Sequence, residues 1–165
     1  MHACRPLRLE DAAAWRALRL IGVRAFPWGF LATPEELEAQ DLRACQEILA
    51  QGAYHGVFAG EALAGFCGLH RQRLRSTRHR AEIGPFFVAP EHHGTGAAQA
   101  LMAHVIAAAR EAGLAQLELG VQPENARAVA FYERQGYVRF GRHPDFARAA
   151  DGTSEDELLY RRVLD

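Results

Sequence analysis

The segment that most constrains the fold of this chain is residues 86–101, where an apolar run passes through a turn of small residues into an amphipathic helix. Gly94 and Gly96 permit a tight turn, and the small side chains around them let backbone N–H groups approach a ligand closely. The helix that follows presents unpaired N–H groups and a partial positive charge at its N-terminus. The segment therefore predicts a strand, a phosphate-binding turn and a helix.

The identity of the phosphate ligand depends on the context of the turn. A dinucleotide-binding fingerprint requires a third glycine or an alanine at the sixth position of the motif, where this chain has Gln99. That fingerprint also follows the first strand of its domain, whereas this turn follows about 90 residues. A dinucleotide site is therefore disfavoured, while a phosphate-binding turn of another fold and a purely structural turn both remain open.

Composition excludes several classes of enzyme. All 19 basic residues are arginine, and without lysine the chain cannot supply a Walker-type phosphate loop, a pyridoxal Schiff base or the lysine of a kinase. His92 and His93 lack the spacing of a zinc motif, so no metal site is expected. Ser76 and Ser154 lie outside any nucleophile elbow, which argues against a serine hydrolase.

Charge and cysteine content indicate the cellular compartment of the chain and the kinds of partner that it does not attract. The formal net charge of −1 provides no general attraction to nucleic acid or to an acidic membrane. The five arginines within residues 71–80 have no aromatic residues between them, so a solvated loop is expected there rather than a nucleic-acid contact. Three cysteines, no apolar run near 18 residues and no secretion signal predict a cytoplasmic protein without a membrane partner.

Hydrophobic periodicity predicts strands and helices along the rest of the chain. A strand at 3–9 precedes a helix from Asp11, and an aromatic loop near residue 26 precedes a second helix. Thr33, Pro34 and Glu36 mark the start of that second helix with an N-cap, an N1 proline and a capping box. Further strands are expected at 54–59, 62–69, 81–89, 114–121, 137–142 and 157–163, helices at 97–113 and 125–135, and an extended loop at 149–154.

The order of these elements predicts an α/β (α+β) fold in a single domain, 1–165. Consecutive strands in the middle of the chain favour antiparallel pairing, whereas the later strand–helix–strand units favour parallel crossovers. A mixed sheet with helices on both faces is therefore expected.

Two stretches carry small, polar and aromatic residues at a distinctive spacing. The first contains Val88, Pro90, His93, Gly94, Gly96, Ala97, Ala98 and Leu101, and the second contains Asn125, Ala128, Phe131, Tyr132, Gly136 and Tyr137. Together they resemble the acyl-CoA-binding and catalytic motifs of the GNAT superfamily of N-acetyltransferases. The expected element order agrees with that fold over nearly the whole chain.

The resemblance implies a mostly antiparallel sheet of six to seven strands in which two neighbouring strands splay apart. Acetyl-CoA would enter the gap as co-substrate, and the irregularity that Pro85 favours is consistent with it. The residues implied to bind the cofactor are Phe86, Phe87 and Val88 along the pantetheine arm, His93, Gly94, Thr95, Gly96, Ala97 and Ala98 at the pyrophosphate, and Asn125 beside them. The family usually has Arg or Gln at the position of His93, whose protonation would add charge beside the pyrophosphate. The arginine-rich loop could also touch the 3′-phosphate of the cofactor.

The resemblance also implies catalytic roles. Tyr132 would protonate the departing thiolate, although core packing alone would also explain a tyrosine there. An amine with a pKa near about 10.4 must lose a proton, which costs roughly 4.6 kcal/mol at pH 7, and Glu82 resembles the base that several members use. A solvated charge at the strand end is the alternative for Glu82.

The acceptor is implied to be a primary amine, on a small molecule or on a peptide or protein. Trp28, Phe30 and Glu157 are expected near it, because aromatic faces and a carboxylate suit a cationic amine. Ordinary core packing remains an alternative for the two aromatic residues. A non-catalytic acyl-CoA sensor of the same fold and a homodimer are both left open.

Overall fold

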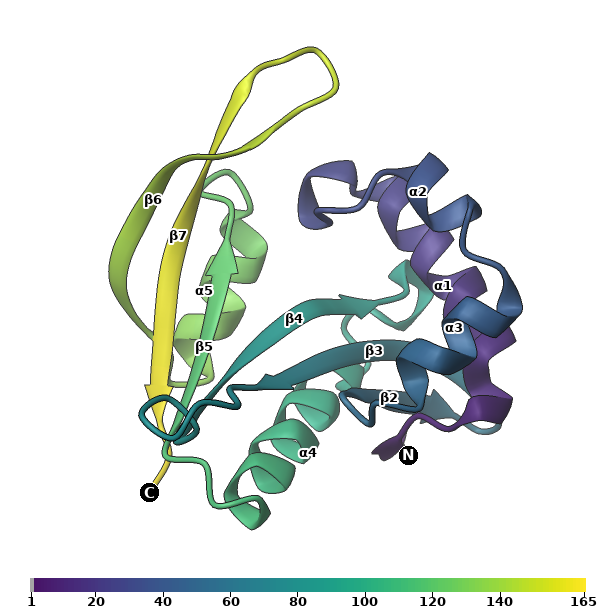
Figure 1. The fold of residues 1–165 in the computed structure, drawn as a ribbon, viewed down its shortest axis with the longest axis horizontal. Coiled ribbons are helices and arrows are strands. Elements are labelled where there is room, and N and C mark those ends of the chain that lie inside the picture. The colour runs from purple at the N-terminus through teal and green to yellow at the C-terminus, as the bar shows by residue number, and fades with distance from the viewer. Residues whose placement is uncertain (1) are drawn as a thin grey trace.

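A seven-stranded sheet forms the centre of the computed structural model, which describes residues 2–165 apart from the side chain of Trp28. The strand order is β1-β2-β3-β4-β5-β7-β6, and every neighbouring pair is antiparallel except the parallel pair β4 and β5. The mixed, mostly antiparallel sheet is confirmed (Figure 1). The strands are β1 (His2–Pro6), β2 (Tyr54–Ala59), β3 (Ala62–Arg71), β4 (Arg80–Val88), β5 (Gln116–Val121), β6 (Val138–Arg148) and β7 (Ser154–Val163).

Helices cover both faces of the sheet, and each face has its own hydrophobic core. The helices are α1 (Ala12–Ala25), α2 (Pro34–Glu38), α3 (Leu42–Leu49), α4 (Ala97–Glu111) and α5 (Ala126–Arg134). On one face, α1 and α3 bury Trp15, Leu18 and Cys45 against Phe66 and Phe87 of the sheet. On the other face, the buried side of α4 joins residues of β3, β4, β5 and β7, and Tyr132 of α5 belongs to the same core.

The capping box at the start of α2 is confirmed. The N–H of Glu36 donates to Thr33 Oγ1 at 3.2 Å, and the N–H of Thr33 donates to Glu36 Oε2 at 2.7 Å. This helix ends at Glu38, and α3 begins separately because Asp41 accepts a hydrogen bond from the N–H of Ala44. The separate helix α3 was not predicted from the sequence.

Two expected boundaries are wrong. The first strand ends at Pro6 rather than at residue 9, because residues 9–11 form a 3-10 turn beside it. The inner ends of the strands expected at 137–142 and 157–163 are the second, because β6 reaches Arg148 and β7 begins at Ser154, with the expected loop between them at 149–153. The end of this hairpin is polar and exposed, so backbone pairing forms it without a hydrophobic pattern that a sequence could reveal.

Strands β4 and β5 pair over only part of their length. Their register runs from Arg80 opposite Gln116 to Glu82 opposite Glu118, and beyond that point the strands diverge (Figure 1). The register between β3 and β4 shifts between Cys67 and Leu69, opposite the segment that contains Pro85. Proline has no N–H to donate to a ladder, so the expected irregularity at Pro85 and the splayed strand pair are both confirmed.

A pair of buried histidines joins α4 to the sheet. Nδ1 of His55 lies 3.0 Å from Nε2 of His104, and His55 is 6% exposed. Burial, together with repulsion from His104, lowers the pKa of His55 to about 4, and burial lowers the pKa of His104 as well. Both rings are therefore neutral in the folded chain near neutral pH.

This pair predicts an acid-sensitive fold. An unfolded histidine takes up its proton near pH 6.5, whereas folded His55 does so only near pH 4, so stability is full above 6.5 and declines as the pH falls toward 4. The free energy of unfolding should be about 2 kcal/mol lower at pH 5 than at pH 7.5. Urea unfolding at both pH values measures it. His55→Gln should remove most of the difference, and the exposed His143→Gln should retain it.

Candidate active site

The predicted phosphate-binding turn lies at the end of β4 that leads into α4. Val88 ends the strand, a 3-10 turn covers Pro90–His92, and Gly94 and Gly96 adopt φ values of 76° and 89°. Residues with side chains rarely adopt these positive φ values, which explains glycine at both positions. Gly96 is the N-cap of α4 and has no side chain to accept from the first-turn N–H groups, so those groups stay available to an anion.

His93 connects this turn to α5. Its Nε2 lies 2.8 Å from the carbonyl oxygen of Val88, and its Nδ1 lies 2.9 Å from NH1 of Arg127. A guanidinium can only donate, so Nδ1 accepts, and Nε2–H donates to Val88. This contact places the positive charge of Arg127 beside the turn.

Sequence reasoning missed Arg127. The available signal was its position in the first turn of α5, two residues after Asn125. Asn125 itself caps this helix, because its Oδ1 accepts from the N–H of Ala128 at 3.2 Å. The end of β4, the start of α4 and the start of α5 are therefore brought together at one place.

An aromatic cluster lies where β4 leaves β5. The ring centroids of Phe86 and Tyr132 are 6.3 Å apart, those of Phe86 and Phe131 are 5.6 Å apart, and Tyr137 packs on Tyr132 at 5.9 Å. Burial, with a smaller effect from Cys67, raises the pKa of the Tyr132 phenol well above its ordinary value. Tyr132 therefore keeps its proton at any physiological pH, so its hydroxyl group is able to donate a hydrogen bond.

Two carboxylates lie on the opposite face of the sheet from this cluster. Glu82 is the last residue of β4 that pairs with β5, and Glu157 of β7 lies half-buried over Gly120 of β5. A Cβ at position 120 would occupy the place of the Glu157 carboxyl group, so a larger residue there would displace this carboxyl group. Burial and the nearby charge of Glu82 raise the pKa of Glu157 to about 7.

Of the two aromatic residues expected at the acceptor site, Phe30 has a described side chain and Trp28 does not. Phe30 packs on Phe87 of β4, with ring centroids 5.8 Å apart, and also approaches Gly22 of α1. It therefore adjoins the core beneath α1 and lies on the same face of the sheet as Glu82. The side chain of Trp28 lies outside the described residues.

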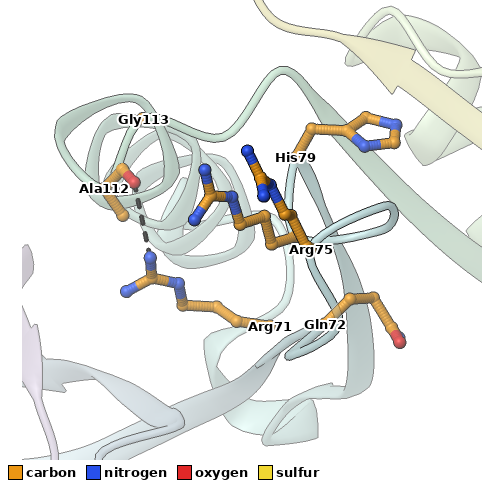
Figure 2. A pocket seen from close by; sticks show the side chains of 7 residues that line it. Arg71, Gln72, Arg75, His79, Ala112 and Gly113 are labelled. Carbon is orange, nitrogen blue, oxygen red and sulfur yellow. Dashed lines mark hydrogen bonds between the residues drawn. The ribbon is translucent and has the colours of Figure 1, made fainter.

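The arginine-rich segment lies far from the phosphate-binding turn. Arg71, Arg75 and Arg78 line a pocket beside Ala112 and Gly113, just after the C-terminal end of α4, whereas the turn adjoins its N-terminus (Figure 2). A contact between this segment and the 3′-phosphate of a cofactor held at the turn does not fit that arrangement.

Residues 2–165, apart from the side chain of Trp28, contain no group of three or more histidine, cysteine, aspartate or glutamate side chains placed to hold a metal ion. No helix among them is both long enough and apolar enough to cross a membrane.

Known structures share this architecture. A GNAT-family acetyltransferase from Streptococcus pneumoniae superposes with a TM-score of 0.86 at 20% identity, covering 99% of both chains. A putative acetyltransferase from Salmonella typhimurium, solved with its cofactor acetyl-CoA, superposes with a TM-score of 0.82 at 18% identity, covering 100% of this chain and 95% of that one. The splayed α/β sheet is therefore an acetyltransferase fold.

Sequence comparison identifies the family. Residues 15–137 match the family described as Acetyltransferase (GNAT) family. The chain is 31% identical over 155 residues to mycothiol acetyltransferase of Salinispora arenicola, across 90% of this chain and 48% of the relative. It is 39% identical over 64 residues to an uncharacterized N-acetyltransferase of Mycobacterium tuberculosis, across 39% of this chain and 41% of the relative. The chain belongs to the GNAT acetyltransferase family, and it spans just under half the length of these curated relatives.

The coupling between the two carboxylates yields a prediction. In Glu82→Gln, the pKa of Glu157 should fall below about 7, because one of the two causes that raise it has been removed. A ¹³C NMR titration of the glutamate carboxyl groups measures this shift. Glu155→Gln, on the same strand, should leave the Glu157 titration unchanged. An unaltered pKa in Glu82→Gln would show that burial alone perturbs Glu157.

Proposed function

We propose that this chain is an N-acetyltransferase that moves an acetyl group from acetyl-CoA to a primary amine by direct attack in a ternary complex. The observation that carries the proposal is the separation of β4 from β5 beyond Glu82 and Glu118. This separation lies between the phosphate-binding turn, the buried phenol of Tyr132 and the carboxyl groups of Glu82 and Glu157. It offers a passage where a thioester and an amine can meet from opposite faces of the sheet.

The edge of β4 suits the pantetheine arm of the cofactor. From Ile83 to Val88 this edge has no pairing with β5, so its backbone groups can hydrogen-bond to an extended, amide-bearing ligand. A backbone N–H between Phe86 and Val88 would stabilise the oxyanion that forms at the acetyl carbonyl. The N–H groups of residues 93–98 and the guanidinium of Arg127 would hold the pyrophosphate, with Asn125 ordering the same region.

Tyr132 is placed to assist the leaving group. The departing thiolate of CoA carries a full negative charge, and its conjugate acid has a pKa near about 8.5. A buried phenol that stays protonated would stabilise this charge by donating a hydrogen bond and would supply the proton as the sulfur leaves. Phe86 and Phe131 pack around the ring and would fix its orientation.

Glu157 suits the role of proton acceptor better than Glu82. A carboxyl group with a pKa of about 7 is half ionised at neutral pH, and its basicity is better matched to an ammonium ion than that of an ordinary glutamate. Glu82 would help by raising the pKa of Glu157 and by attracting the cationic amine. The roles assigned from the sequence, a base at Glu82 and a binding residue at Glu157, are therefore exchanged in this proposal.

The acceptor class follows from charge. Two carboxylates on one open face favour an amine that arrives as a cation, and Phe30 would line the same face. The relatives include enzymes named mycothiol acetyltransferase and, among similar structures, a ribosomal-protein-alanine N-acetyltransferase from Brucella melitensis. Small-molecule and protein amines are therefore both reasonable acceptors, and a broad panel must contain each kind.

The first test measures turnover. Incubation with acetyl-CoA and a panel of small amines and N-terminal peptides should release free CoA thiol with at least one acceptor. Tyr132→Phe should lower kcat by about tenfold or more while leaving the Kd for acetyl-CoA nearly unchanged, because the hydroxyl acts on the leaving group. Tight acetyl-CoA binding with no turnover on any amine would instead support a non-catalytic acyl-CoA sensor.

The second test identifies the base. The kcat/KM of the wild type should rise with pH through about 7, since Glu157 must be deprotonated to accept a proton. Glu157→Gln should abolish this rise, which is the ascending limb of the pH profile, and should lower kcat by about 100-fold or more. Glu82→Gln should move the limb to lower pH, and Glu155→Gln should match the wild type. A limb that persists in Glu157→Gln and disappears in Glu82→Gln would assign the base to Glu82.

A further inference from the structure

A strongly basic pocket lies beside the C-terminal end of α4, whereas the predicted phosphate-binding turn lies at the N-terminal end of this helix. The turn between β3 and β4 and the residues that follow α4 enclose a pocket of about 390 Å³ (Figure 2). Its charged lining consists of Arg71, Arg75 and Arg78, and His79 lies beside them. The uncharged remainder of the lining includes no carboxylate.

The arginines of this pocket have little internal charge compensation. Among the described residues, the ion pairs of the 71–80 segment are limited to Arg80 with Glu118. Arg71 donates to the carbonyl oxygen of Ala112 at 3.4 Å, which partly satisfies one guanidinium. Arg75 and Arg78 have no such partner among these residues. Like charges held around one hollow repel one another, so an anion bound there would relieve the repulsion.

The backbone that carries these arginines is well ordered by hydrogen bonds. The N–H of Gln72 donates to the carbonyl of Arg80, and the N–H of Arg78 donates to the carbonyl of Leu74. The carbonyl of His79 accepts from the N–H groups of Ala115 and Gln116, which attaches the turn to the chain entering β5. The backbone that carries the arginines is thus ordered before any ligand arrives, so binding need not pay for ordering this turn.

We propose that this pocket binds a small phosphate-bearing anion, such as a phosphate ester or pyrophosphate. This site is separate from the phosphate-binding turn before α4 that would hold acetyl-CoA, which is called the acetyl-CoA turn below. Guanidinium groups form paired hydrogen bonds to phosphate oxygens, and three of them converge here. The volume lies within the usual range for small-ligand sites. Helix α4 has 15 residues, so its length alone separates the two sites by about 22 Å.

A small anion fits the pocket better than a nucleic acid does. Single-stranded nucleic acids bind grooves in which aromatic rings stack on bases, and residues 71–80 contain no phenylalanine, tyrosine or tryptophan. The whole chain carries a net charge of −1, which gives little long-range attraction to a polyanion. The cationic groups surround a single hollow and do not extend along a strip.

The test uses inorganic pyrophosphate as the probe and the full chain labelled with ¹⁵N. Pyrophosphate should shift the backbone amide resonances of residues 75–79 and Gly113, and a second set of shifts at residues 94–98 would report the acetyl-CoA turn separately. The experiment is repeated with saturating CoA, which should suppress only the second set. The pocket is thereby tested independently of the proposed enzymatic function.

Matched variants distinguish a specific anion-binding site from a general effect of surface charge. The double variant Arg75→Ala/Arg78→Ala should weaken pyrophosphate binding at the pocket by about tenfold or more, because it removes two charge-assisted contacts. Arg73→Ala removes a charge from the same turn outside the pocket lining and should change the Kd less than twofold. These arginines are exposed, so all variants should retain the thermal stability of the wild type.

Three results would overturn the proposal. Shifts confined to residues 94–98 would place pyrophosphate only at the acetyl-CoA turn. Equal weakening by Arg73→Ala and by the double variant would indicate a diffuse charge effect. Tighter binding of a single-stranded oligonucleotide that depends equally on Arg73, Arg75 and Arg78 would indicate a nucleic-acid surface instead.

Discussion

The interrupted pairing between β4 and β5 is the constraint on which the rest of this molecule depends. Three residue pairs join the strands, and the backbone then separates where β4 passes an irregularity opposite β3. Backbone groups left without a partner inside a protein are costly, so such a gap persists only when solvent or a ligand satisfies them. In the proposed function, this divergence forms a passage that the turn before α4, Tyr132 and the two carboxylates would border.

Electrostatics differ sharply between the two faces of that passage. On the α4 face, burial keeps the phenol of Tyr132 protonated. On the other face, partial burial and a neighbouring negative charge make Glu157 an unusually basic carboxylate. In the proposed function, Tyr132 as proton donor and Glu157 as proton acceptor would supply the two proton transfers that aminolysis of a thioester requires.

Much of the fold was predictable because local signals agreed with the tertiary arrangement. The capping box at Thr33, the glycine turn before α4 and the alternating strands each arise from short-range physics that a sequence displays directly. The long β6–β7 hairpin was underestimated, since its polar end is joined by backbone pairing and polar side-chain contacts that no hydrophobic pattern reveals. The cofactor-binding residues and the role of Tyr132 depended on a family resemblance and belong to the proposed function.

The sequence by itself determined the α/β class, the glycine turn before α4, the absence of lysine chemistry and the membership of an acetyltransferase family. Only the tertiary structure brought Arg127 to His93 and set the carboxyl group of Glu157 over Gly120 beside Glu82. It also placed the arginines between β3 and β4 around a pocket that is remote from the glycine turn before α4. These contacts join residues far apart in the chain. Their existence depends on sheet order and strand divergence, which no local pattern encodes.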